Sequence, residues 1–243
     1  MSELIIEDHG FVTTFTINRP ERKNSINSAV GDALYEGLTK FQASDQRVAV
    51  IAAKGKHFSG GADIADVPPI WKEQPLLGVK LDKPVICAVN GDCVGAALVI
   101  ALFCDLCVAS ENATFWYPEA RVGMTGGIAA TLVTRIPHKL AMEMLLLARK
   151  VPAQRAYEMG FVNQVVPQGQ AFNAAMEMAQ ELAAMAPLVH RIIKRFADAT
   201  LPQSPAEASA RAQNDVNVIK TSSDRAEGIG AFLEGRNPNF SSK

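Results

Sequence analysis

The sequence predicts an α/β core followed by an entirely helical region, and two patterns support this fold class. Over the first two thirds of the chain, short apolar segments rich in Val and Ile alternate with segments of helical periodicity, as they do in α/β folds. From Ala171 onward the strand pattern ends, and Pro187, Pro205 and Ser223 each begin a further helical segment. We expect this tail to pack on the core or on another subunit, because it has little partner surface of its own.

The N-terminal part of the chain predicts a hairpin, a helix and a buried strand. The hairpin has strands over residues 4–7 and 12–17 around the turn Asp8-His9-Gly10. Ser28 is the expected N-cap of a helix that extends to about residue 43. Apolar residues recur at helical spacing along it (Val30, Leu34, Leu38 and Phe41). Residues 48–53 form the buried strand.

Two loops follow this strand. Residues 54–63 are rich in glycine, and residues 65–81 contain three prolines and Trp71. We expect residues 65–81 to be a variable, mobile flap that covers a site.

The middle of the chain is organised around residues 84–105. Residues 84–89 read as a buried strand, Asn90-Gly91 breaks the chain, and residues 95–103 are apolar throughout. This apolar run is far shorter than the roughly 20 residues that a membrane span requires, so we predict a buried helix. A helix that begins above the end of a strand presents unpaired N–H groups to an anion or a polarised oxygen.

The remaining elements continue the alternation. Strands are expected over residues 106–109, 114–117 and 162–166. Helices are expected from Gly126-Gly127 to about residue 135 and over residues 140–148, 153–159, 171–185 and 187–199.

Composition excludes several classes of protein. With 243 residues, 48% of them hydrophobic, the chain can bury one substantial core. A net charge of −1 without a basic block argues against nucleic acid as a partner. The first ten residues carry acidic side chains and no long apolar run, so we predict neither a secretory signal nor a membrane partner.

The four cysteines lie in the apolar middle of the chain. Cys104 and Cys107 form a C-x-x-C pair, but neither a second pair nor a nearby His completes a metal set. We therefore interpret the cysteines as reduced core thiols of a cytoplasmic protein, with no metal site.

Several motifs, taken together and in order, resemble the crotonase family, also called the enoyl-CoA hydratase/isomerase superfamily. They are NRPERKNSIN (18–27), HFSGGADI (57–64), KPVICAVNGDCVGAA (83–97), ALFCDLCVA (101–109), FWYPEARVG (115–123), LAMEMLLLAR (140–149), FVNQVVP (161–167) and AFLEGRNPNF (231–240). This resemblance implies a crotonase-like spiral of ββα units that binds an acyl-CoA thioester and assembles as a homotrimer or hexamer. It implies a catalytic core over residues 1–188 and a helical C-terminal region over residues 189–243 for trimerisation and for closing the CoA pocket. No cofactor is implied, because coenzyme A enters as part of the substrate.

The resemblance also implies two backbone N–H groups that hold the thioester oxygen as it becomes an enolate. Residue by residue, these donors fall on Gly60 and Ala96. Glycine lets the backbone approach a ligand closely, and Ala96 lies in the first turn of the expected helix. One such donor contributes about 10²–10³ in rate, because it acts on charge that appears only during the reaction.

The number of glutamates at the matched catalytic positions distinguishes between the reactions of this family. Hydratases of this family use two glutamates, whose positions are occupied here by Val99 and Glu119. Valine cannot transfer a proton, which puts water addition in doubt, whereas one glutamate suffices for an allylic isomerase. We therefore expect a Δ3,Δ2-enoyl-CoA isomerase with Glu119 as its acid/base. A hydratase-like lyase or another thioester activity is the alternative, and a non-catalytic acyl-CoA-binding protein is the alternative from another class.

Further residues match family segments that contact substrate. Lys23 and the backbone of Ala62, Asp63 and Ile64 match segments near the nucleotide end of CoA, and Phe232 matches an aromatic that a neighbouring subunit presents to the adenine. Val99, Trp116 and Tyr117 are expected to line the acyl pocket. The turn before residue 128 is two residues shorter than the family pattern, which predicts a different preference for the acyl chain. We interpret His57, beside the glycine-rich loop, as a surface histidine.

Overall fold

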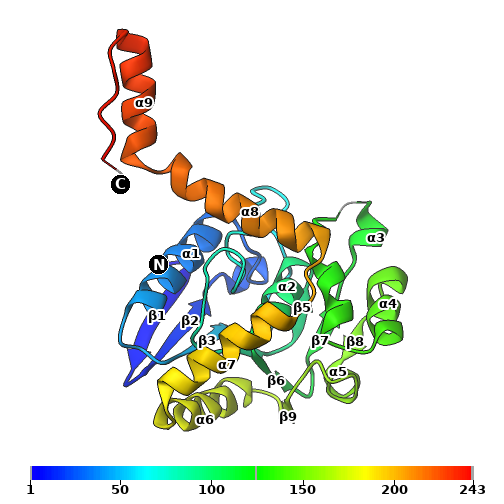
Figure 1. Cartoon of the computed structure of the whole chain (residues 1–243). Coiled ribbons are helices and arrows are strands. Elements are labelled where there is room, and N and C mark those ends of the chain that lie inside the picture. Colours follow the sequence, from blue (N-terminus) through cyan, green and yellow to red (C-terminus); the bar gives the residue numbers. More distant parts are fainter. Residues whose placement is uncertain (1, 124, 242–243) are drawn as a thin grey trace.

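The computed structural model describes residues 2–123 and 125–241. Its main sheet has six strands, with helices packed around it (Figure 1). The strand order is β1-β2-β3-β4-β6-β9. Only the hairpin of β1 and β2 is antiparallel, and the other neighbours are parallel. The bounds are β1 (Leu4–His9), β2 (Val12–Ile17), β3 (Val48–Ala53), β4 (Val85–Val89), β6 (Leu106–Ser110) and β9 (Gln164–Val166).

A second, three-stranded sheet has the order β5-β7-β8. Its strands are β5 (Asp92–Val94), β7 (Thr114–Trp116) and β8 (Val151–Pro152). The chain passes from β4 to β5 and then into α2 (Ala96–Phe103), and again from β6 to β7 and then into α3 (Glu119–Val122). Each unit thus gives one strand to each sheet before a helix, which confirms the expected ββα repeat. Strands as short as β5 and β8 carry no periodicity, so the sequence did not predict them.

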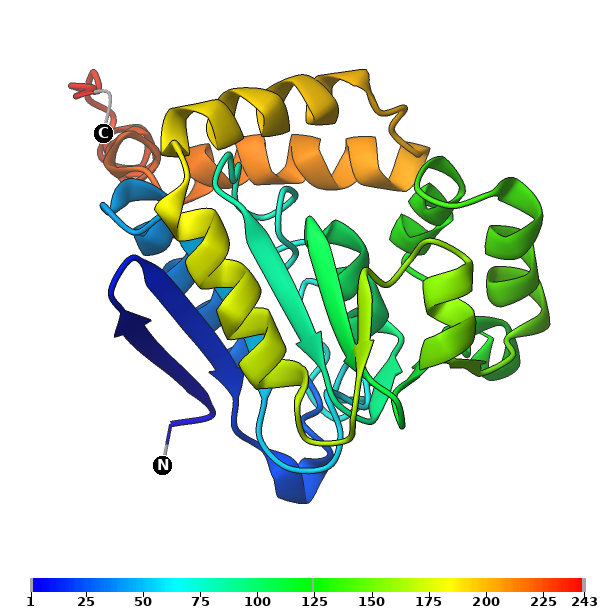
Figure 2. The same cartoon turned by 90° about the horizontal axis from the view of Figure 1, so that it is seen from below.

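The main sheet is buried on both faces, which explains its continuous apolar strands. In β3, Ala49 and Ile51 belong to the core on one face, while Val48 and Val50 belong to the core on the other. Helix α6 (Ala171–Ala184) lies across the second face (Figure 2). It buries alanines one turn apart, and their small side chains allow close packing on the strands: Ala171, Ala175, Ala179 and Ala183.

Helix α1 (Ser28–Ala43) packs its predicted apolar positions on the opposite face. Its N-cap is Asn27 rather than the predicted Ser28, because the Asn27 side chain accepts a hydrogen bond from Val30 N at 3.0 Å. Ser28 instead donates to the Asp66 carboxylate at 2.6 Å. Both side chains are good caps, and contacts far along the chain decide which one caps the helix.

The segment of residues 65–81 is packed against the core over its second half, in contrast to the expected flap. Glu73 and Gln74 are fully buried, and Leu77 belongs to the core beside α1. Gly78 lies so close to the Lys72 carbonyl that a Cβ there would come within 1.7 Å of the oxygen. Only residues 64–67, before Pro68, form an exposed stretch.

The remaining helices surround one end of the sheets and extend beyond them. They are η1 (Pro20–Arg22), η2 (Ile128–Thr134), α4 (His138–Leu147), α5 (Ala153–Glu158), α7 (Pro187–Thr200), α8 (Pro205–Lys220) and α9 (Ser223–Glu234). The helix expected to end near residue 135 is the 3₁₀ helix η2 rather than an α-helix. No helix within residues 2–123 and 125–241 combines the length and apolarity needed to cross a membrane.

Helix α7 is tied to the core by charge. Lys194 donates to the Lys83 carbonyl at 2.6 Å and pairs with Asp105 at 2.7 Å. The expected domain boundary between residues 188 and 189 falls inside this helix. Helix α9, in contrast, projects away from the core (Figure 1).

Candidate active site

The start of helix α2 is the centre of the candidate site. Gly95 adopts a positive φ of 53°, and its N–H donates to the Trp116 carbonyl at 2.9 Å. This conformation suits glycine and turns the chain abruptly from β5 into α2. Ala96, the first helical residue, has an N–H with no acceptor among the described residues. The helix therefore directs an unpaired donor and the positive end of its dipole to one point.

The glycine-rich loop lies directly against this helix start. Ser59 accepts from Val94 N at 3.1 Å and donates its own N–H to the Asp92 carbonyl at 3.0 Å, which pairs the loop with β5. Gly61 has a φ of 95°, and a Cβ there would lie 2.9 Å from the Val94 carbonyl and 3.8 Å from Ala96 N. Only glycine permits this approach without strain.

The free backbone amide of the glycine-rich loop belongs to a different residue from the one that the family resemblance implied. The Gly60 N–H already donates to the Lys23 carbonyl at 2.8 Å. The N–H of Ala62 has no acceptor within the described part of the chain, and its neighbour Gly61 adjoins Ala96 N. The structure thus assigns the free amide of this loop to Ala62 in place of Gly60, beside the predicted donor Ala96.

Glu119 lies beside the start of α2. It is the first residue of α3, and a Cβ on Gly95 would lie 3.3 Å from its Oε1 atom. Its Oε2 atom is buried and has no hydrogen-bond partner in the described residues. Burial raises the pKa of Glu119 from 4.5 to about 7, while its own backbone N–H lowers it. A carboxyl with this pKa is poised for proton transfer near neutral pH.

No neighbouring carboxylate contributes to this pKa shift, which arises from burial. Val99, at the position of the other hydratase glutamate, is an apolar side chain buried within α2. Among the described residues, the site therefore offers one carboxylate for acid/base chemistry.

A cavity of about 550 Å³ opens beside Glu119. Its volume is typical of a small-ligand site. The Tyr117 hydroxyl and Thr125 Oγ1 form a hydrogen bond of 2.9 Å at its wall. The described lining residues are Tyr117, Glu119, Ala120, Gly123, Thr125, Gly127, Ala130, Val133, Met142, Leu145 and Leu146.

Other predicted pocket residues lie elsewhere. Trp116 and Val99 are absent from the described lining of this cavity. The Trp116 indole N–H donates to the Ala148 carbonyl at 2.9 Å, and the Lys150 ammonium lies 5.2 Å from its ring centroid. Phe232 is 84% exposed on α9, far from Glu119 in sequence and on the projecting helix.

The residues predicted for the nucleotide end of CoA lie at the end of the glycine-rich loop and beside it, where Lys23 adjoins Gly60. Lys23 has an exposed side chain and a left-handed backbone with φ of 50°. The Asp63 side chain is structural, because it pairs with Arg19 at 3.2 Å. Its pKa is lowered, chiefly by the hydrogen bond from Ala65 N. Ile64 is 83% exposed.

Sequence reasoning missed two polar pairs. Thr125 directly precedes Gly126-Gly127 of the shortened turn, but nothing in the sequence of this turn predicted its hydrogen bond to Tyr117. His57 was expected at the surface, yet it is only partly exposed and its Nδ1 atom lies 3.0 Å from the Asp92 carboxylate. Asp92 belongs to β5, a strand too short to be predicted.

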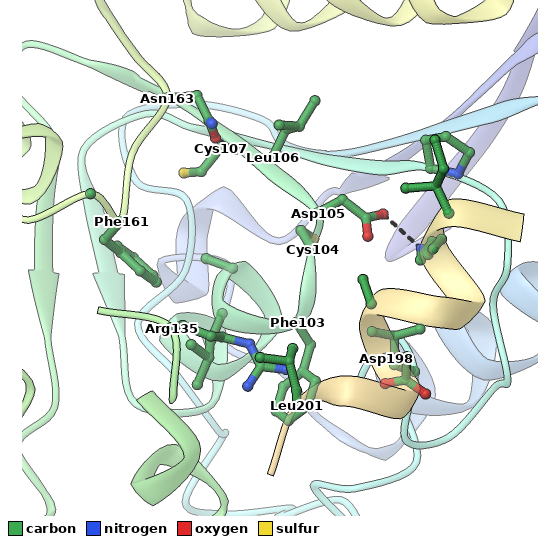
Figure 3. A pocket seen from close by; sticks show the side chains of 18 of the residues that line it. Phe103, Cys104, Asp105, Leu106, Cys107, Arg135, Phe161, Asn163, Asp198 and Leu201 are labelled. Carbon is green, nitrogen blue, oxygen red and sulfur yellow. Dashed lines mark hydrogen bonds and ion pairs between the residues drawn. The ribbon is translucent and has the colours of Figure 1, made fainter. Parts of the chain in front are cut away.

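A second cavity, of about 470 Å³, lies at the other end of α2 (Figure 3). Its charged groups are already engaged, since Asp105 pairs with Lys194 and the Arg135 guanidinium lies 4.8 Å from the Phe103 ring centroid. Cys104 is another of its lining residues. The four cysteines are free thiols, and no group of His, Cys, Asp or Glu in residues 2–123 and 125–241 has the arrangement of a metal site.

Comparisons with known proteins agree with this geometry. A family model described as Enoyl-CoA hydratase/isomerase matches residues 7–243. A 2,3-dehydroadipyl-CoA hydratase from Escherichia coli (strain K12) is 32% identical over 253 residues, covering 99% of both chains. An (E)-benzylidenesuccinyl-CoA hydratase from Thauera aromatica is 34% identical over 249 residues, covering 97% of both. The crystal structure of an enoyl-CoA hydratase from Mycobacterium tuberculosis H37Rv is similar with a TM-score of 0.77 at 31% identity, covering 100% of both chains.

Proposed function

This chain belongs to the enoyl-CoA hydratase/isomerase family, and we propose that it is a Δ3,Δ2-enoyl-CoA isomerase, which converts 3-enoyl-CoA into 2-enoyl-CoA thioesters. One observation carries the proposal. Glu119, with a pKa of about 7, is the sole acid among the described residues that line the cavity, and it adjoins the start of α2. An allylic proton shift needs one group that both removes and returns a proton.

The proposed mechanism uses three groups of this chain. The Glu119 carboxylate removes a proton from C2 of the 3-enoyl thioester, and the electron pair moves onto the thioester oxygen to give a dienolate. The N–H groups of Ala62 and Ala96 stabilise that oxygen as its negative charge develops. Protonated Glu119 then returns the proton at C4, so that the double bond moves from C3–C4 to C2–C3. Glu119 ends the cycle ionised, ready for the next substrate.

Hydration is the second candidate, because the two curated relatives compared above are named hydratases. Water addition by the two-glutamate route requires a group that activates water, and Val99 supplies none. We therefore place hydration below isomerisation. A non-catalytic acyl-CoA-binding protein is the third candidate, and the raised pKa of Glu119 argues against it.

The test is a paired assay on purified protein. With a 3-enoyl-CoA, we expect the absorbance of a conjugated 2-enoyl thioester to appear; with a 2-enoyl-CoA, we expect little loss of that absorbance. Glu119→Gln keeps the shape of the side chain but removes its basicity, so isomerisation should fall by about 10²-fold or more. Glu143→Gln is the matched control, because Glu143 lies on α4 beside Arg149 and Arg155 rather than in the cavity lining.

Two results would contradict the proposal. Efficient hydration of 2-enoyl-CoA by the wild-type protein would favour a hydratase that activates water by another group. Isomerisation that survives Glu119→Gln would show that another residue moves the proton.

We also propose, on the family resemblance, how the rest of the substrate binds and how the chain assembles. Lys23 and the backbone of residues 62–64 would contact the nucleotide end of CoA, where a lysine serves as a point charge for phosphate. The region of residues 189–243 would form a homotrimer or hexamer and close the CoA pocket. Exposed apolar side chains on α7, α8 and α9 support this assembly. Location in the cytoplasm stays a prediction of the sequence.

A further inference from the structure

We propose that the cavity beside Glu119 selects thioesters whose acyl chain is uncharged to its distal end, and rejects chains that end in a carboxylate. This inference rests on the proposed function in one respect, because it takes the acyl group to enter that cavity. It goes further by naming the substrate class.

The described walls of the cavity carry no cationic side chain. Apolar side chains from α3, η2 and α4 form most of the described lining: Ala120, Ala130, Val133, Met142, Leu145 and Leu146. No Lys, Arg or His is among the described lining residues. A carboxylate that enters such a cavity loses water without gaining an ion pair, which is strongly unfavourable.

The ionisable side chains around the cavity oppose a second negative charge. Glu119 must be ionised to act as a base, and its carboxylate would repel another carboxylate inside the same low-dielectric cavity. Tyr117 offers no positive charge, and burial raises the pKa of its hydroxyl, so that it stays neutral.

The two hydroxyl groups of the cavity bring no positive charge to it. Tyr117 and Thr125 share a hydrogen bond of 2.9 Å, and Thr125 Oγ1 also accepts from Gly127 N at 3.0 Å. This bond uses one of the two O–H groups, and the other is a neutral donor that cannot replace the ion pair a buried carboxylate requires.

Three arginines that adjoin the cavity in sequence make contacts outside its lining. Arg121 donates from Nε to the Ala148 carbonyl at 3.2 Å. Arg149 and Arg155 lie 3.8 and 3.9 Å from the Glu143 carboxylate. None of these three arginines is among the described residues that line the cavity.

The mouth of the cavity is apolar as well. Leu146 lines the cavity and is also 66% exposed, so it lies where the cavity meets solvent. A long aliphatic chain would continue over this side chain, and each additional buried methylene adds to its affinity.

Binding of two matched, unreactive thioesters tests the inference. Octanoyl-CoA and suberoyl-CoA have acyl chains of the same length, but the second ends in a carboxylate, and neither carries a double bond. Isothermal titration calorimetry of the wild-type protein should give octanoyl-CoA at least about tenfold higher affinity, as apolar pockets discriminate by such factors. Equal affinities, or tighter binding of suberoyl-CoA, would overturn the inference, and so would octanoyl-CoA binding no tighter than free CoA.

A charge placed at the mouth should change this preference. Leu146→Arg puts a guanidinium on the cavity lining at a side chain that is already exposed, so the fold should tolerate it. We expect the octanoyl-to-suberoyl affinity ratio to fall by about tenfold or more. Leu147→Arg is the matched control, since Leu147 is its exposed neighbour on α4 but is not among the described lining residues. An unchanged ratio in Leu146→Arg, or an equal drop in Leu147→Arg, would contradict the inference.

These titrations also separate the inference from the proposed reaction. They measure binding without turnover, so a protein that lacks isomerase activity but prefers octanoyl-CoA would refute the reaction and leave the substrate class standing.

Discussion

At the scale of single residues, Glu119 is the candidate acid/base because burial raises its pKa by more than the hydrogen bond from its own backbone N–H lowers it. One carboxylate oxygen is buried and unpaired, and its pKa rises to about 7. An ionised carboxylate in that place is costly, and this cost makes it a stronger base than an exposed glutamate.

This pKa predicts the pH dependence of the proposed reaction. The base form of Glu119 must remove the proton from C2, and that form declines about tenfold per pH unit below a pKa of about 7. We expect kcat/KM for a 3-enoyl-CoA to rise with pH up to about 7 and then to level off. A pH–rate profile between pH 5 and 9 measures it. A rate independent of pH below 7 would mean that another group limits the reaction.

Glu119 and Ala96, which the family resemblance assigns to one site, lie close together in the structure, but the sequence did not identify Ala62 as the second free amide. Gly60 and Ala62 both lie in the same loop, and their residue types do not distinguish them. What distinguishes them is the hydrogen bond from Gly60 N to the Lys23 carbonyl, which depends on how η1 packs against the loop. Side-chain chemistry is readable from sequence, whereas the pairing of backbone groups between distant loops is not.

At the scale of elements, the segment of residues 65–81 is the clearest departure from expectation. Prolines and the absence of periodicity suggested a flap, yet Gly78 and Leu77 pack tightly against their surroundings. The periodic spacing of apolar residues predicts helices and long strands, whereas an irregular segment has no such period from which its packing could be predicted. Strands β5 and β8 were not predicted for the same reason, because they are too short to show a period.

Glu73 makes the stability of this segment depend on pH. It is fully buried beside α1, its Oε2 atom has no partner among the described residues, and burial raises its pKa from 4.5 to about 8. The folded state therefore holds this proton more tightly than the unfolded state. Its stabilising contribution is complete below about pH 4.5 and is lost as pH rises through about 8.

Replacing Glu73 by Gln should remove this dependence. The neutral amide keeps the size of the side chain, so we expect Glu73→Gln to be more stable than the wild type at pH 8 by a few kcal/mol, and by much less at pH 5. Urea unfolding at the two pH values measures the difference. Glu111→Gln, in an exposed loop, is the control and should shift neither value. A gain for Glu73→Gln that is the same at both pH values would refute the titration account.

At the scale of the whole molecule, the alternation of strands and helices indicated the α/β core, whereas the ββα repeat was implied by the family resemblance. The main sheet is buried on both faces, in keeping with its continuous apolar strands, and the alanines of α6 explain why one helix covers its second face so closely. The arrangement of the helices after residue 186 was not readable. Their apolar residues have no complete partner within the described chain, so their own periodicity does not say where they pack.

The exposed apolar side chains of α9 carry the last prediction, on assembly. Leu233 is 78% exposed on a helix that projects from the core, and a buried leucine contributes roughly 1.5–3 kcal/mol. A cyclic trimer loses this contribution at three equivalent positions, so Leu233→Asp should shift the protein toward monomers. Gln168→Asp introduces the same charge in an exposed loop outside α7, α8 and α9 and should leave assembly unchanged. Size-exclusion chromatography with light scattering measures both variants against the chain mass of 26.1 kDa. A wild-type protein that is monomeric at micromolar concentration would refute the proposed trimer, whatever the variants do.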